Sequence, residues 1–265
     1  MEAISFMPLY EVTLFGVKFS QTMIASLSGT VFFLIFLFVY ALMKKKNPRN
    51  GLTNLVDMGI ESITGFFQEL GGHVPLKLIK IVVFIFIYIL WCNLVGLIGD
   101  LFVLAAPSLH YYFRPVSTDV FFNMVLAFLA VTGSVIYGFQ ANGFHYIEKY
   151  VGYKGLGIVK KVTGIWSFIG KILDIVIWLF IGLIELVGEV ARILSLSLRL
   201  FWNILAGMVL LGLIVYATQL FIKVPLLFPL IVVFFELFVG FLQAFVFSML
   251  VLVYFKMAGE GHAEH

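Results

Sequence analysis

The sequence predicts an all-α polytopic membrane protein with about five spanning helices, one amphipathic surface helix and a long tilted hairpin at the C-terminal end. Hydrophobic residues make up 62% of the 265 residues and charged residues only 12%, whereas a soluble domain carries roughly 25% charge. The mean hydropathy is +1.11. Several apolar stretches exceed the ~20 residues that cross a bilayer, and the alternating segments of a membrane barrel are absent. We therefore expect residues 1–265 to form a single membrane domain.

Composition also excludes several functions. The net charge of +3 is too small to indicate a nucleic-acid partner. The single cysteine, Cys92, lies in an apolar run, where it is expected to be a small buried side chain. There is no glycine-rich phosphate loop, no metal-ligand spacing of histidines and no nucleophile–base pair. We expect no cofactor, no metal and no catalytic residue.

The first 20 residues are mixed, and we expect an N-terminal tail there with some amphipathic character, without a cleavable signal. The first span is predicted over 22–43 and stops at the lysine run 44–46. Basic residues next to a span mark the cytoplasmic side, so the N-terminus is expected outside. Residues 52–70 have one apolar face and three acids, which predicts a helix lying on the inner membrane surface.

The next two spans are predicted over 78–105 and 119–141. Asn93 lies in the first of them, close to Gly96 and Gly99, and a hydrogen bond to another helix is the simpler explanation for it. Asp119 opens the second and is interpreted either as a helix N-cap or as part of a polar entrance at the outer surface. The lysines of 142–163 form a second basic cluster, again expected inside.

Residues 165–222 contain no proline and no turn cluster, which favours one long tilted helix over two short spans. One helix gives five spans and a cytoplasmic C-terminus, whereas two give six spans and an outer C-terminus. A short turn at 223–225 leads to the last predicted helix, 226–257.

The long helix carries an arginine, Arg199, inside its apolar run. A charge at the centre of a membrane helix costs about 2.5–3.5 kcal/mol on insertion scales. No countercharge lies three or four positions away, so a partner must come from another helix or another chain. Glu185 and Asn203 share the face of Arg199, because they lie fourteen positions before it and four after it. Arg192 is close to this face too and can pair locally with Glu189.

The last helix carries a matching stripe of Glu236, Gly240 and Gln243. Carboxylates within the membrane mark ion or proton pathways by default. Two structural alternatives remain: Glu236 pairs with Arg199, and Gln243 only joins two helices. Taken together, the two stripes fit the movement of a proton or a small ion.

The stretch from Ser195 to Gly207, centred on Arg199, resembles the signature of subunit a in the Fo sector of rotary F-type ATP synthases. Three further segments resemble that family in order: residues 93–98, residues 117–119, and Glu236 with residues 242–247. The resemblance extends over roughly 50–258, and the arginine motif is its most specific part.

The resemblance implies a non-catalytic stator subunit beside a rotating ring of c subunits, held by peripheral-stalk b subunits in the lipid bilayer. Two offset half-channels would carry protons to and from a carboxylate of the ring. Arg199 would face that carboxylate and separate the half-channels, with Asn203 and Gln243 as polar neighbours. Glu236 and Asp119 would line the outer half-channel, and Glu185 the inner one. Multi-pass insertion in a bacterial inner membrane is expected.

Two residues depart from the family pattern. Trp202 replaces a residue that is usually small, and Met208 replaces a glutamate or histidine. The outer half-channel would then have one titratable group where two are common. The sequence leaves open whether the ion is a proton or sodium. A stand-alone transporter or channel is the alternative function, while a membrane enzyme of lipid metabolism lacks any catalytic constellation.

Overall fold

The computed structural model describes residues 11–14, 17–47, 50–105, 120–143, 146, 165–221 and 227–259. The elements in chain order are strands β1 (Glu11–Leu14) and β2 (Val17–Ser20), then helices α1 (Gln21–Lys46), α2 (Gly51–Gly71), α3 (Leu76–Ala105), α4 (Val120–Asn142), α6 (Ile165–Phe221) and α7 (Leu227–Gly259). Five of the helices are long and apolar enough to cross a membrane. The predicted all-helical class of multi-pass membrane protein is confirmed.

The strands β1 and β2 form a small antiparallel hairpin before the first helix, where the sequence had predicted only a tail. Glu11 pairs with Ser20 and Leu14 with Val17. Apolar and polar residues alternate through both strands, and two residues separate them, as in a short β-hairpin. This alternation is typical of β-strands, but the sequence prediction considered only the amphipathic character of the segment.

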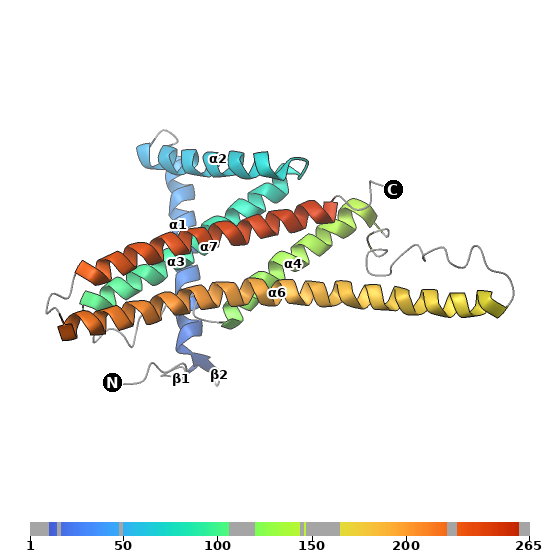
Figure 1. Cartoon of the computed structure of the whole chain (residues 1–265). Helices are drawn as coiled ribbons and strands as arrows, with labels where there is room; N and C mark the ends of the chain where they lie inside the picture. The colour runs from blue at the N-terminus through green and yellow to red at the C-terminus, as the bar shows by residue number, and fades with distance from the viewer. Residues whose placement is uncertain are drawn as a thin grey trace.

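Helices α1 and α2 meet at a polar corner. The last turn of α1 carries Lys44, Lys45 and Lys46. Their positive charges interact favourably with the negative, C-terminal end of the helix dipole. Asn50, in extended conformation, precedes α2, and its carbonyl oxygen accepts hydrogen bonds from the Asn54 amide (3.0 Å) and the Thr53 hydroxyl (2.8 Å). The helix ends at Gly71 and is followed by Gly72, which adopts φ +58°, a conformation open to glycine. In Figure 1, α2 lies across the end of α1.

The core lies where α3, α4, α6 and α7 pack together. Its largest fully buried side chains include Phe247 of α7, Ile79 of α3 and Leu200 of α6. Helix α2 adds Phe67, which is 1% exposed and meets the rings of Phe86 and Phe245. The amphipathic helix is thus held against the bundle by its aromatic face.

Helix α6 is one continuous helix of 57 residues. At 1.5 Å per residue it is about 86 Å long, far longer than the ~30 Å hydrocarbon core of a bilayer. A helix of this length has to be strongly tilted or extend beyond the membrane. Figure 1 shows α6 running alongside α7 and then continuing past the other helices, across the direction of α1. The two-span alternative for this region is therefore wrong, and the turn expected at 223–225 lies outside the described residues.

Candidate functional site

Arg199 lies on the outer face of the helix pair. Its neighbours Leu196, Ser197 and Leu200 are each 1% exposed, because this side of α6 packs against the bundle. Arg199 itself is exposed, as is Leu198. No hydrogen bond or ion pair joins Arg199 to any residue in the part of the chain that the structure describes. The alternative in which Arg199 pairs with Glu236 is not seen.

One turn along α6, a hydrogen bond joins the two helices of the hairpin. The Asn203 Nδ2 atom donates to the Gln243 Oε1 atom of α7 at 2.6 Å. Gln243 is only 4% exposed, and its Nε2 atom has no hydrogen-bond partner among the described residues. A buried amide with an unused donor is costly unless it meets water or a ligand, so this position is suited to contact a bound water molecule.

Two turns along α6 from Arg199, a glycine leaves room for an acid. The nearest side-chain atom to a Cβ built on Gly207 is the Glu236 Oε1 atom, at 2.7 Å. The other carboxyl oxygen, Oε2, is buried and has no hydrogen-bond partner among the described residues. Any side chain at position 207 would therefore push this carboxyl group aside. Gly207 belongs to the arginine motif, but its closeness to Glu236 depends on the register between α6 and α7, which the sequence does not reveal.

These groups line one small cavity between α3, α6 and α7. Its walls include Asn93, Asn203, Glu236, Gly240 and Gln243, and it offers about 20 Å³ of space for the centre of a water molecule. This is room for about one water molecule. The Asn93 Nδ2 atom donates to the Gly240 carbonyl at 2.9 Å, so Asn93 joins two helices as expected and also faces the cavity. Cys92, 2% exposed, is buried as expected and lines the same space.

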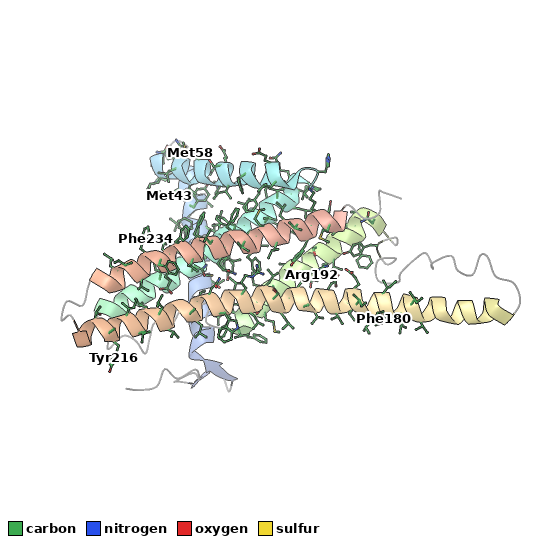
Figure 2. All side chains as sticks on the ribbon, viewed as in Figure 1. Met43, Met58, Phe180, Arg192, Tyr216 and Phe234 are labelled. Carbon is green, nitrogen blue, oxygen red and sulfur yellow. The ribbon has the colours of Figure 1, made fainter. Side chains whose placement is uncertain are left out.

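Glu185 belongs to a different part of the helix. The Arg192 Nη2 atom lies 3.7 Å from the Glu185 Oε1 atom, and the Arg192 guanidinium lies 5.4 Å from the centre of the Tyr254 ring. Arg192 thus reaches back two turns to Glu185. The local pairing with Glu189 stays a prediction. Tyr254 of α7 gave no sequence signal. Figure 2 places Arg192 where α6 passes the other helices, whereas Phe180 lies on the part that extends beyond them.

The structure thus separates the predicted residues into two groups along α6. Asn203, Gln243 and Glu236 share the cavity, whereas Glu185 does not line it. Glu185 lies fourteen residues before Arg199, or about 21 Å along the helix, and Gly207, beside Glu236, lies eight residues after it, or about 12 Å. Arg199 therefore lies between the two acids along the helix axis. Asp119 lies outside the described residues. Within the described ranges, no three side chains of His, Cys, Asp or Glu gather to hold a metal ion.

Comparison with known proteins identifies one family. A family model described as "ATP synthase A chain" matches residues 22–256. An ATP synthase subunit a of Azorhizobium caulinodans is 28% identical over 193 residues, covering 72% of this chain and 65% of the relative. One of Rhizobium etli is 29% identical over 154 residues, covering 58% of this chain and 50% of the relative. The chain therefore spans between half and two thirds of the length of these curated relatives.

Proposed function

This chain belongs to the family of the ATP synthase A chain, and from that premise we propose that it is the proton-conducting, non-catalytic subunit of a stator. In this role the chain forms two half-channels against a ring of c subunits and couples proton flow to the rotation of that ring. Residues 1–265 act as one membrane domain, since α3, α4, α6 and α7 share one core.

The observation that carries the proposal is the exposed, partnerless Arg199 on a membrane-spanning face. A buried arginine of a self-contained transporter would find its countercharge within the chain, because an uncompensated charge in lipid is expensive. Here the described part of the chain supplies none. The missing carboxylate is best supplied by a second protein that packs against this face of α6.

The attraction between Arg199 and a ring carboxylate can be compared with the energy that a membrane potential supplies. Opposite charges 4 Å apart attract by about 4 kcal/mol at an effective dielectric constant of 20. This is sufficient to keep a passing carboxylate deprotonated beside Arg199. A potential of 100 mV acting on one charge supplies about 2.3 kcal/mol, which is comparable with the attraction and allows the pair to separate.

The two acids on either side of Arg199 support offset half-channels. Glu236, with the water-sized cavity, belongs to the outer half-channel, and Asn203 and Gln243 connect it to the arginine. Glu185 belongs to the inner half-channel, and Asp119 to the outer one. A direct path for protons between the two acids would have to pass the fixed charge of Arg199.

The remaining assignments follow from the family and from the charge distribution. The peripheral-stalk b subunits hold the chain in place, and the host is a bacterial inner membrane, as the bacterial relatives suggest. The lysines that end α1 are cytoplasmic, which puts the N-terminus outside and the C-terminus inside. The coupling ion is a proton, and the choice between proton and sodium belongs to the ion-binding site of the ring.

Cross-linking tests the proposed contact with the ring. In a Cys92→Ala background, Leu198→Cys places a thiol beside Arg199 on the exposed face, where Leu198 is 42% exposed. Leu196→Cys is the matched control, because Leu196 is 1% exposed and faces the bundle. We expect oxidation of membranes from the assembled complex to join the Leu198→Cys variant, and not the control, to a ring subunit carrying engineered cysteines.

The outcome separates the proposal from its alternative. A stand-alone transporter would give no cross-link to a small carboxylate-bearing protein, and the purified chain would conduct protons in liposomes without a ring. Conduction by the chain alone, with no ring subunit cross-linked or co-purified, would overturn the proposal.

A further inference from the structure

A second, larger cavity lies between α1, α2 and α3. It is a half-open groove with a volume of about 450 Å³, and its walls are mostly apolar and aromatic, among them Phe33, Phe84 and Trp91. None of its lining residues lines the cavity beside Glu236. The groove is therefore a separate feature that the proposed proton path does not use.

The length of the groove fits one leaflet of a bilayer. Along α3 its walls run from Lys80 to Leu94, fourteen residues or about 21 Å. Helix α3 runs obliquely to α1 (Figure 1), so this length covers a smaller depth of the membrane, comparable with the ~15 Å of one leaflet. Residues of α2, which lies across the end of α1, form its surface end (Figure 1).

This shape favours a lipid chain over a helix of another protein. A spanning helix needs the full thickness of the core and would have to cross the membrane surface where Val56, Ile60 and Thr64 of α2 line the groove. An acyl chain needs only one leaflet and enters from the side, where the groove is open. The apolar walls also favour an apolar occupant, because water in the groove would be in contact with apolar and aromatic surface, which is unfavourable.

The charges at the surface end select the headgroup. Lys80 is exposed and lines the groove, and Lys77 lies one turn before it at the start of α3. In the described part of the chain, neither Lys77 nor Lys80 has an ion-pair partner, and Asp57 of α2 pairs with Lys44 at 2.7 Å. The other carboxylate on this stretch of α2 is Glu61. Basic residues between helices at the membrane surface attract anionic lipid headgroups.

We propose that this groove binds one acyl chain of an anionic phospholipid, whose headgroup phosphate lies beside Lys80. The chain fills the space between α1 and α3 and so holds the first helix against the bundle. The direct contacts here include the Trp91 Nε1 atom donating to the Gly29 carbonyl at 3.3 Å and the ring of Phe36 stacked on Trp91.

Trp91 lets the occupant be measured directly. In a variant with Trp166, Trp178 and Trp202 changed to phenylalanine, Trp91 is the sole tryptophan of this chain. The full chain is reconstituted in phosphatidylcholine vesicles that contain phosphatidylglycerol or phosphatidylcholine brominated at mid-chain, and quenching of fluorescence is measured. We expect half-maximal quenching by brominated phosphatidylglycerol at a mole fraction about fivefold lower than by brominated phosphatidylcholine. This is the preference that one lysine near the membrane surface supplies.

Charge variants test the role of the headgroup. Lys80→Gln should remove the preference, so that both lipids quench alike. Lys256→Gln is the matched control: it removes a lysine from the last turn of α7, outside the groove, and should leave the preference unchanged. Equal quenching by both lipids in the unmodified chain, or no quenching by either, would overturn the proposal.

The assembled complex distinguishes a lipid from a protein occupant. A photoreactive benzoylphenylalanine replaces Ile60 in the groove or, as control, Leu55, which is 69% exposed and does not line the groove. We expect the Ile60 variant to label phospholipid enriched in anionic classes over the membrane average, and the Leu55 variant to label lipids in proportion. Labelling of another protein chain from Ile60 would contradict the proposal, whether or not proton conduction by this chain is confirmed.

Discussion

The Asn203 side chain donates a hydrogen bond to Gln243 across the α6–α7 hairpin, at 2.6 Å and one turn from Arg199. This bond joins the two helices where both lie against packed surfaces. Gln243 is 4% exposed, and Leu200, three residues before Asn203, is 1% exposed. Arg199 therefore lies one turn from a polar contact between α6 and α7.

A double-mutant cycle on this pair measures its strength. Asn203→Ala, Gln243→Ala and the double variant should give a coupling of about 0.6 kcal/mol in the free energy of unfolding, the average for such bonds in a membrane protein. Unfolding in mixed detergent micelles provides the measurement. Strictly additive effects would mean that the two amides do not interact in the folded chain.

Gly207→Ala should impair proton conduction by displacing Glu236. The added Cβ would lie 2.7 Å from the Glu236 Oε1 atom, so the carboxyl group at the end of this flexible side chain would have to move away from its present position. ATP-driven proton pumping in inverted vesicles should fall severalfold. Glu236→Asp in the same chain shortens the acid and should restore part of the rate.

Gly212→Ala is the matched control for that experiment, because no atom lies within 4 Å of the position that its Cβ would occupy. It should pump at the unmodified rate. If both glycine variants lose the same activity, the effect comes from a general change in helix α6 and not from crowding of Glu236.

The corner between α1 and α2 should be sensitive to acid. Hydrogen bonds from Lys44 and then Tyr40 lower the pKa of the Asp57 carboxyl group below its usual range. A lowered pKa in the folded state means that the contact stabilises the corner above the unfolded pKa of ~3.9 and is lost as pH falls through the folded value.

Hydrogen exchange of the α2 amides checks this effect. Exchange of these amides, relative to the intrinsic rate, should become faster as the pH drops below about 4. In the Asp57→Asn variant the same amides should already exchange faster at neutral pH, and lowering the pH should change their exchange little. Glu69→Gln, an exposed acid on the same helix, should behave like the unmodified chain. An acid response that survives Asp57→Asn would assign it to another group.

Trp202 is expected to contribute to the contact with the ring. It is 59% exposed, three residues from Arg199, and its indole packs edge-on to Phe201. Trp202→Ala should change the unfolding free energy of the isolated chain by less than about 0.5 kcal/mol, as for other exposed sites, but lower the amount of ring that co-purifies. Leu213→Ala, 62% exposed and farther along α6, is the control. Unchanged recovery of the ring would show that Trp202 faces lipid.

Helical periodicity predicted much of this arrangement and failed where distant helices meet. The spacing of apolar residues was enough to predict helices, and a step of four placed Asn203 on the face of Arg199. The same arithmetic did not predict that the Arg192 guanidinium lies over the Tyr254 ring, because this contact depends on how α6 and α7 pack. The closeness of Gly207 to Glu236 depends on how α7 lies along α6, which a single sequence does not encode in any local pattern.

The exposed charge of Arg199 is the centre of the proposed mechanism, and its removal is the most direct test. ATP synthesis driven by an imposed proton gradient is measured in membranes that contain the assembled complex with Arg199→Ala, beside Leu198→Ala as a neighbouring exposed control. We predict assembly in both, synthesis at the background level in Arg199→Ala and near-normal synthesis in the control. Normal synthesis by an assembled Arg199→Ala complex would contradict the mechanism.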